Sequence, residues 1–183
     1  MEVLFRALTT GKLCLFGEKI FADQIKIDVI LGEFRQKMNT LSLWKNNFEE
    51  MDKVALAFAL GRSELDDLDM VFITKTDFES LFSFDFTAKG NTTYEKMKKT
   101  HCNIIDITFS QYKQFVSYVI DEINQEHCKS YTQYELECIA AFQIEKKDLS
   151  LNSIPKPWKK TVIEEIKKIN PNFFERQETS EEQ

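Results

Sequence analysis

Glycine and proline, the residues that most often interrupt helices and strands, are scarce in this sequence. Its 183 residues include 5 glycines and 3 prolines, whereas average usage predicts roughly 13 and 9. Because β sandwiches and barrels need turn residues between many short strands, this scarcity favours long helices. It also excludes collagen-like and low-complexity chains. The composition therefore predicts a mostly α fold.

Apolar residues recur at helical spacing in five segments, which supports the same prediction. The segments are 23–38, 42–60, 110–125, 132–146 and the stretch after Pro155 and Pro157. In the fourth segment, Thr132 and Glu135 have the spacing of a helix capping box. Apolar residues cover most of its circumference, which is typical of a helix buried among other helices. We therefore expect a layered helical bundle.

One segment has the period of a strand. Residues 81–87 alternate phenylalanines with polar residues, and a period of two is the signal of a half-buried strand. We expect one short β element there, inside a single helical domain over residues 1–174. The polar residues 94–102 predict a connection. The acidic residues 175–183 predict a disordered tail.

Charge and hydropathy limit the partners that we expect. The chain has 24 lysines and arginines against 30 acidic residues, a net charge of −6. This balance argues against a general nucleic-acid surface, which needs clustered positive charge. No apolar run approaches the ~20 residues of a membrane span, and no signal-peptide core is evident. We expect an intracellular protein with reduced cysteines and no contact with nucleic acid or membrane.

The sequence offers little support for catalysis or metal binding. It has no phosphate-binding glycine loop, nucleophile elbow or zinc-protease histidine pair. The pairs His101-Cys102 and His127-Cys128 lack the gap between ligands that lets a loop wrap a zinc ion. His127 could activate the Cys128 thiol, but no carboxylate that would orient it is obvious. The sequence therefore predicts no enzyme, no metal and no cofactor.

Three stretches resemble the ligand-binding domain of nuclear hormone receptors, most closely the divergent orphan receptors of nematodes. Residues 44–56 are similar to the family's pattern of Trp, Phe-x-x-Leu and an Asp-Lys pair, and residues 58–68 to the following helix with its arginine. Residues 131–140 resemble the internal helix with its glutamate. The phenylalanines of 81–87 stand where the family has a β turn. The resemblance implies the layered receptor fold, a nuclear location and a role in transcription.

The resemblance also implies a set of site residues. A small apolar ligand would contact Trp44, Phe48, Phe58, Arg62 and Phe84. The guanidinium of Arg62 would hold the polar end of this ligand with its fixed fork of donors. Lys53 would lie in a groove for a coregulator protein, and the domain would form homodimers or heterodimers. Glu135 would pair with Lys159 or Lys160, a role that competes with capping.

Two hypotheses follow, and composition does not separate them. The leading one is a receptor-like regulatory binding module in transcription that binds a small apolar ligand, a partner protein or both. The alternative is a helical protein–protein interaction module with a packed core and no ligand. The 16 phenylalanines could fill a core or line a pocket, since ligand pockets are also mostly apolar.

Overall fold

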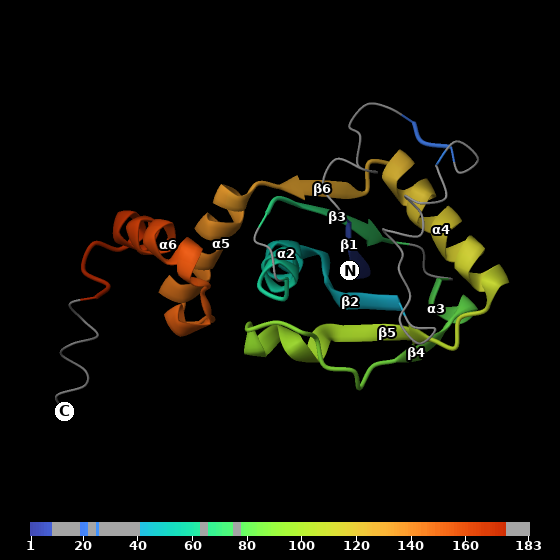
Figure 1. The fold of residues 1–183 in the computed structure, drawn as a ribbon, viewed down its shortest axis with the longest axis horizontal. Helices are drawn as coiled ribbons and strands as arrows, with labels where there is room; N and C mark the ends of the chain where they lie inside the picture. Colours follow the sequence, from blue (N-terminus) through green and yellow to red (C-terminus); the bar gives the residue numbers. More distant parts are fainter. Residues whose placement is uncertain (9–18, 22–24, 26–40, 63–65, 75–77, 175–183) are drawn as a thin grey trace.

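An antiparallel β-sheet forms the centre of the molecule (Figure 1). The computed structural model describes residues 1–8, 19–21, 25, 41–62, 66–74 and 78–174. Within them, six strands pair in the order β4-β5-β2-β1-β3-β6, and every pairing is antiparallel. The strands are β1 (Glu2–Leu8), β2 (Leu41–Asn47), β3 (Leu68–Ile73), β4 (Ser83–Asp85), β5 (His101–Ile105) and β6 (Cys128–Tyr131). The predicted mostly α, layered helical bundle is therefore wrong, as is the all-α receptor fold that the resemblance implied.

The central strand β1 supplies side chains to two cores, one on each face of the sheet. Val3 and Phe5 pack on one face, whereas Leu4 and Leu8 pack on the other. Successive side chains of a strand point to opposite faces. A strand covered on both faces is therefore apolar at nearly every position. Such a strand lacks the alternation of polar and apolar residues by which a half-exposed strand is recognised.

Helices cover both faces of this sheet (Figure 1). On the face of Val3 and Phe5, α2 (Met51–Ala59) lies on the sheet, α5 (Gln133–Glu145) packs on α2, and α6 (Lys156–Ile169) packs on α5. On the face of Leu4 and Leu8, the core includes α4 (Phe109–Asn124) and the short α3 (Phe78–Leu81). The fold is thus an α/β fold. None of the helices in these described ranges is long and apolar enough to cross a bilayer.

The three helices predicted in the second half of the chain are confirmed as α4, α5 and α6. At the start of α5, the Thr132 hydroxyl accepts a hydrogen bond from the backbone N–H of Glu135 at 3.2 Å. The Glu135 carboxylate in turn accepts from the backbone N–H of Thr132 at 2.7 Å. The capping box read from the sequence is therefore confirmed. Glu135 has this role in place of the ion pair that the resemblance implied.

The predicted helix 42–60 is wrong in its first half. Residues 41–47 form β2, a 3₁₀ turn follows at Phe48–Glu50, and only α2 is helical. The spacing of Trp44, Phe48 and Met51 imitated one helix face, although Trp44 lies on the strand. In β2, Leu41 and Leu43 pack into one core and Trp44 into the other. This pattern again reflects burial on both faces.

The short β element predicted in 81–87 is confirmed as β4, but β4 is the edge of a six-stranded sheet and not an isolated excursion. Its partner β5 overlaps residues 94–102, which were predicted as a connection and contain a 3₁₀ helix at Glu95–Thr100 followed by the start of β5. The predicted helix 23–38 and the predicted tail 175–183 lie outside the described residues, apart from Ile25.

Candidate functional site

An open hollow lies where the carboxyl end of α2 meets two connecting segments. One segment precedes β5, and the other is the 3₁₀ turn Leu151–Ser153 between α5 and α6. The volume of the hollow is about 760 Å³, and small-molecule sites measure about 300–1,000 Å³. Its lining consists of Leu60, Gly61, Arg62, Asn91, Thr92, Thr93, Glu95, Lys98, Asn152 and Ser153. The hollow is therefore a candidate site for a polar ligand.

A close approach between two backbone segments forms one side of the hollow. The side-chain amide of Asn91 donates a hydrogen bond to the carbonyl of Gly61 at 3.2 Å. A Cβ atom at Gly61 would lie 1.9 Å from the carbonyl oxygen of Asn91, far inside van der Waals contact. Glycine at position 61 therefore lets the loop of Asn91 rest directly on the end of α2.

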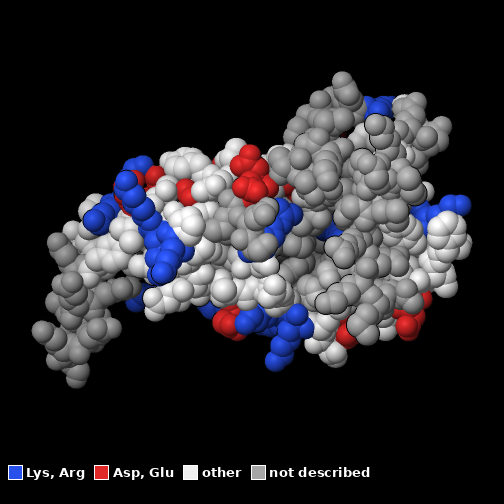
Figure 2. Space-filling view, viewed as in Figure 1, with Lys and Arg blue, Asp and Glu red and all other residues white. Residues whose placement is uncertain are grey.

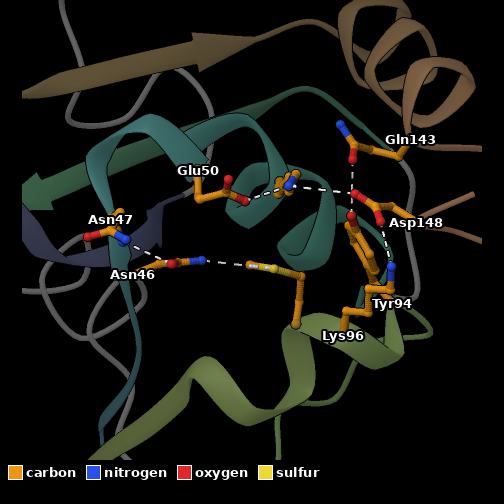
Figure 3. A network of polar contacts seen from close by, with 9 residues as sticks. Asn46, Asn47, Glu50, Tyr94, Lys96, Gln143 and Asp148 are labelled. Atoms are coloured by element: carbon orange, nitrogen blue, oxygen red, sulfur yellow. Dashed lines mark hydrogen bonds and ion pairs between the residues drawn. The ribbon is translucent and has the colours of Figure 1, made fainter. Parts of the chain in front are cut away.

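A network of charged side chains holds the segment before β5, which contributes Glu95 and Lys98 to the hollow (Figure 3). Lys53 on α2 forms ion pairs with Glu50 at 2.7 Å and with Asp148, just after α5, at 3.7 Å. Lys96 pairs with the same Asp148 carboxylate at 2.5 Å. The hydrogen bond from Lys96 holds the pKa of Asp148 below its ordinary value, and the bond to Glu50 raises the pKa of Lys53. The network thus ties the segment before β5 to both α2 and α5.

Tyr94 joins the same segment to α5 from within the core. Its hydroxyl donates to the side-chain carbonyl of Gln143 at 3.2 Å (Figure 3), and its side chain is buried. Burial raises the pKa of Tyr94 well above its ordinary value, so the hydroxyl stays protonated and keeps donating. The backbone N–H of Tyr94 donates to the Thr92 hydroxyl at 3.2 Å. Thr92 can therefore donate its own proton to another acceptor.

Charged side chains form part of the described lining of the hollow. The guanidinium of Arg62 donates to the carbonyl of Leu8 at 3.2 Å, which anchors it beside the end of β1. Lys98 pairs with Glu95 at 2.5 Å, and both side chains line the hollow. Two cationic side chains and one carboxylate are thus among the described lining residues. Both cations are donors that suit an anionic group.

The predicted ligand contacts are only partly brought together. Arg62 lines the hollow. Trp44 and Phe58 contact one another, with ring centroids 5.4 Å apart, and Trp44 is almost completely buried. Trp44 also lies edge-on to the ring of His101 at 5.5 Å. These two aromatic side chains are part of the packing between α2 and the sheet, and neither lines the hollow.

The other predicted residues lie apart from Arg62. Phe84 packs against Phe78 in the core on the opposite face of the sheet. Phe48 lies edge-on to Phe72, with centroids 5.1 Å apart, and Lys53 belongs to the ion-pair network. The five predicted ligand contacts therefore do not surround one pocket. The ligand- and partner-binding roles of these residues stay predictions.

Sequence reasoning missed a carboxylate that orients His127. Glu122 on α4 is fully buried, contacts Nδ1 of His127 through its carboxylate, and accepts a hydrogen bond from the backbone N–H of Thr74 at 3.1 Å. The ring of His127 stacks on Phe72 at 5.1 Å. A glutamate five residues before a histidine, at the end of a helix, was the available signal. No group of three or more potential metal ligands occurs within the described residues.

Comparisons with known proteins place the chain in no family. No family model, curated protein or solved structure matches it. The nuclear-receptor and transcription assignments therefore have no support beyond the motif resemblance, and the antiparallel sheet contradicts the fold that they require.

Proposed function

We propose that this chain is a binding domain, without catalytic activity, whose hollow at the end of α2 binds a small hydroxylated anion. The observation that carries the proposal is the polar lining of the hollow, whose described residues include the cationic side chains of Arg62 and Lys98. Both can donate charge-assisted hydrogen bonds to an anionic ligand.

Hydrogen-bonding groups in the lining match the hydroxyl groups of such a ligand. The described lining includes the hydroxyls of Thr92, Thr93 and Ser153 and the amides of Asn91 and Asn152. The Thr93 hydroxyl already donates to the Ser153 carbonyl at 2.8 Å, so its lone pairs remain available to accept. Hydroxyls and amides both donate and accept, which suits a ligand with several alcohol groups.

Size and shape narrow the ligand further. A volume of about 760 Å³ exceeds what a lone inorganic anion fills, so we propose an organic molecule such as a sugar phosphate or a sugar acid. No aromatic side chain is among the described lining residues, which disfavours nucleotides because their bases bind by stacking. Because the lining is polar, this proposal has a polar anion in place of the small apolar ligand that the receptor resemblance implied.

The residue types in the described lining support binding without turnover. The described lining contains neither histidine nor cysteine, and its one carboxylate, Glu95, is paired with Lys98. General acid–base catalysis needs a group whose proton can move near neutral pH. We also propose an intracellular location, because the free thiol of Cys102 is buried in the core and such thiols persist where the milieu is reducing.

Isothermal titration calorimetry on the full chain tests the proposal with glucose 6-phosphate, glucuronate, glucose and AMP. We expect one of the two sugar anions to bind, with glucose and AMP much weaker. Replacing a charged donor typically costs about 1.5–3 kcal/mol, so Arg62→Ala and Lys98→Gln should each weaken binding at least tenfold. Lys89→Gln is the matched control, since Lys89 is exposed on the same loop and does not line the hollow. Equal loss in the control, or binding that ignores Arg62, would refute the site.

A further inference from the structure

The face of α6 turned away from α5 carries a row of charged side chains. Three residues of the inner face are fully buried: Trp158, Val162 and Ile166. Four residues of the opposite face are exposed: Lys156, Lys160, Glu164 and Lys167. Their spacing of i, i+4, i+8 and i+11 places the four on one side of the helix, in a row about 16 Å long. We call these four residues the α6 row.

The three lysines of the α6 row form no ion pair with any residue in the part of the chain that the structure describes. Some other lysines are paired, such as Lys168 with Glu165 at 2.5 Å and Lys96 with Asp148 at 2.5 Å, whereas exposed lysines such as Lys89 and Lys113 also lack an ion pair within the described residues but do not form a row on one helix face. Lysine and arginine side chains gather over the end of the molecule that α5 and α6 form (Figure 2). An acidic chain thus presents a locally positive helix face.

We propose that the α6 row is a docking surface for an acidic helix of a partner protein. Read from Lys156 to Lys167, the charges are positive, positive, negative, positive. A partner helix that runs antiparallel to α6 matches them with acidic residues at positions i, i+7 and i+11 and a lysine at i+3. Antiparallel packing also sets the opposite ends of the two helix dipoles against each other. Charges arranged in this way set the partner and the register of helix pairs.

Glu164 distinguishes this partner from the other polyanions that lysines attract. It lies between Lys160 and Lys167 in the row, where a uniformly negative phosphate backbone or lipid surface would meet repulsion. The apolar face of α6 is buried against α5, so the helix cannot insert it into a membrane. A second copy of this chain carries the same net charge of −6, which opposes self-association.

The test uses the full chain and a synthetic helical peptide with the charge pattern given above. Its comparison peptide has the same composition but exchanges the lysine at i+3 with the acidic residue at i+7. We expect the first peptide to bind at least tenfold more tightly at low salt, and 0.5 M NaCl to abolish the difference. The triple variant Lys156→Glu, Lys160→Glu, Lys167→Glu should weaken binding of the first peptide at least tenfold.

A control variant and three competing probes make the result decisive. Lys89→Glu, Lys99→Glu and Lys113→Glu change the net charge equally at exposed positions outside the α6 row, and this triple variant should bind the peptide within twofold of the parent. Glu164→Lys should remove the preference between the two peptides. Equal binding of both peptides by the parent chain, or no binding of either, overturns the proposal. The proposal is also overturned if a 20-base-pair DNA duplex or phosphatidylserine vesicles bind more tightly than the first peptide. It is likewise overturned if the parent chain self-associates and the variant Lys156→Glu, Lys160→Glu, Lys167→Glu does not.

Discussion

The substitution Gly61→Ala tests the close approach between the loop that contains Asn91 and the end of α2. The new Cβ would lie 1.9 Å from the Asn91 carbonyl oxygen, whereas real Cβ contacts are essentially never shorter than 3.0 Å. The loop would therefore have to move by about 1.1 Å. Overpacking of this kind costs about 1–3 kcal/mol. Loss of the hydrogen bond from the Asn91 side-chain amide to the Gly61 carbonyl adds about 0.5–1.5 kcal/mol. Replacing glycine lowers the conformational entropy of the unfolded chain, which stabilises the folded state by about 0.4–1 kcal/mol.

The net expectation is a loss of about 2 kcal/mol in the free energy of unfolding, or about 1 M in the urea midpoint at a slope of about 2 kcal/mol/M. This loss can be measured by urea titration with tryptophan fluorescence as the signal, since Trp44 and Trp158 are both buried. Asn91→Ala is the matched variant, because it removes the same hydrogen bond without a clash and should lose only about 1 kcal/mol. If Gly61→Ala proved as stable as the parent chain, the close approach of the two backbones would be refuted.

Three further predictions follow from the fold. Thr132→Ala removes the cap of α5 and should lower the free energy of unfolding by about 1 kcal/mol, measured by urea titration; an unchanged midpoint would contradict the capping box. Burial lowers the pKa of His101 below its ordinary value, with a partly opposing hydrogen bond to the Ala88 carbonyl. The unfolded chain therefore binds the proton more tightly, and stability should fall as the pH drops below about 6.5. This fall should be smaller in His101→Gln when urea midpoints at pH 7.5 and 5.5 are compared, and an identical fall would exclude His101 as its source. Burial also raises the pKa of the Cys102 thiol to about 12, so site-resolved alkylation of the native chain at pH 8 should modify half-buried Cys138 before buried Cys102, and the reverse order would contradict the burial of Cys102.

The helices α4, α5 and α6 could be predicted from the sequence, because each has a recognisable start and a regular apolar pattern. Thr132 and Glu135 at the start of α5, and Pro155 just before α6, are signals that act within one turn of helix. Apart from β4, whose alternating phenylalanines were recognised, the strands could not be predicted in the same way. Residues 68–73 of β3 are buried at nearly every position because helices cover both faces. A short apolar run of this kind does not distinguish a strand from a buried helix.

Most residues that line the hollow could not be predicted from the sequence either. Arg62 could be singled out, although on a resemblance whose fold is contradicted. Its neighbours are distant from it in the sequence: Thr92 and Lys98 lie in the segment before β5, and Ser153 follows α5. They meet Arg62 only because the fold brings these two segments beside α2. Scarcity of glycine predicted helices, yet the sheet needs few tight turns because helices and long connections join most of its strands.

The order of strands in the sheet has a consequence for how the chain assembles. β1 lies in the interior of the sheet, β2 pairs on one side of it and β3 on the other, and β5 and β6 then extend these two sides. Each new strand can therefore join at an edge that is still open, and only β4 has to wait for a strand that follows it. None of these six described strands has to be inserted between two that are already paired. A chain that emerges slowly from the ribosome can build this sheet outward from its first strand, with its unpaired edges occupied as synthesis proceeds.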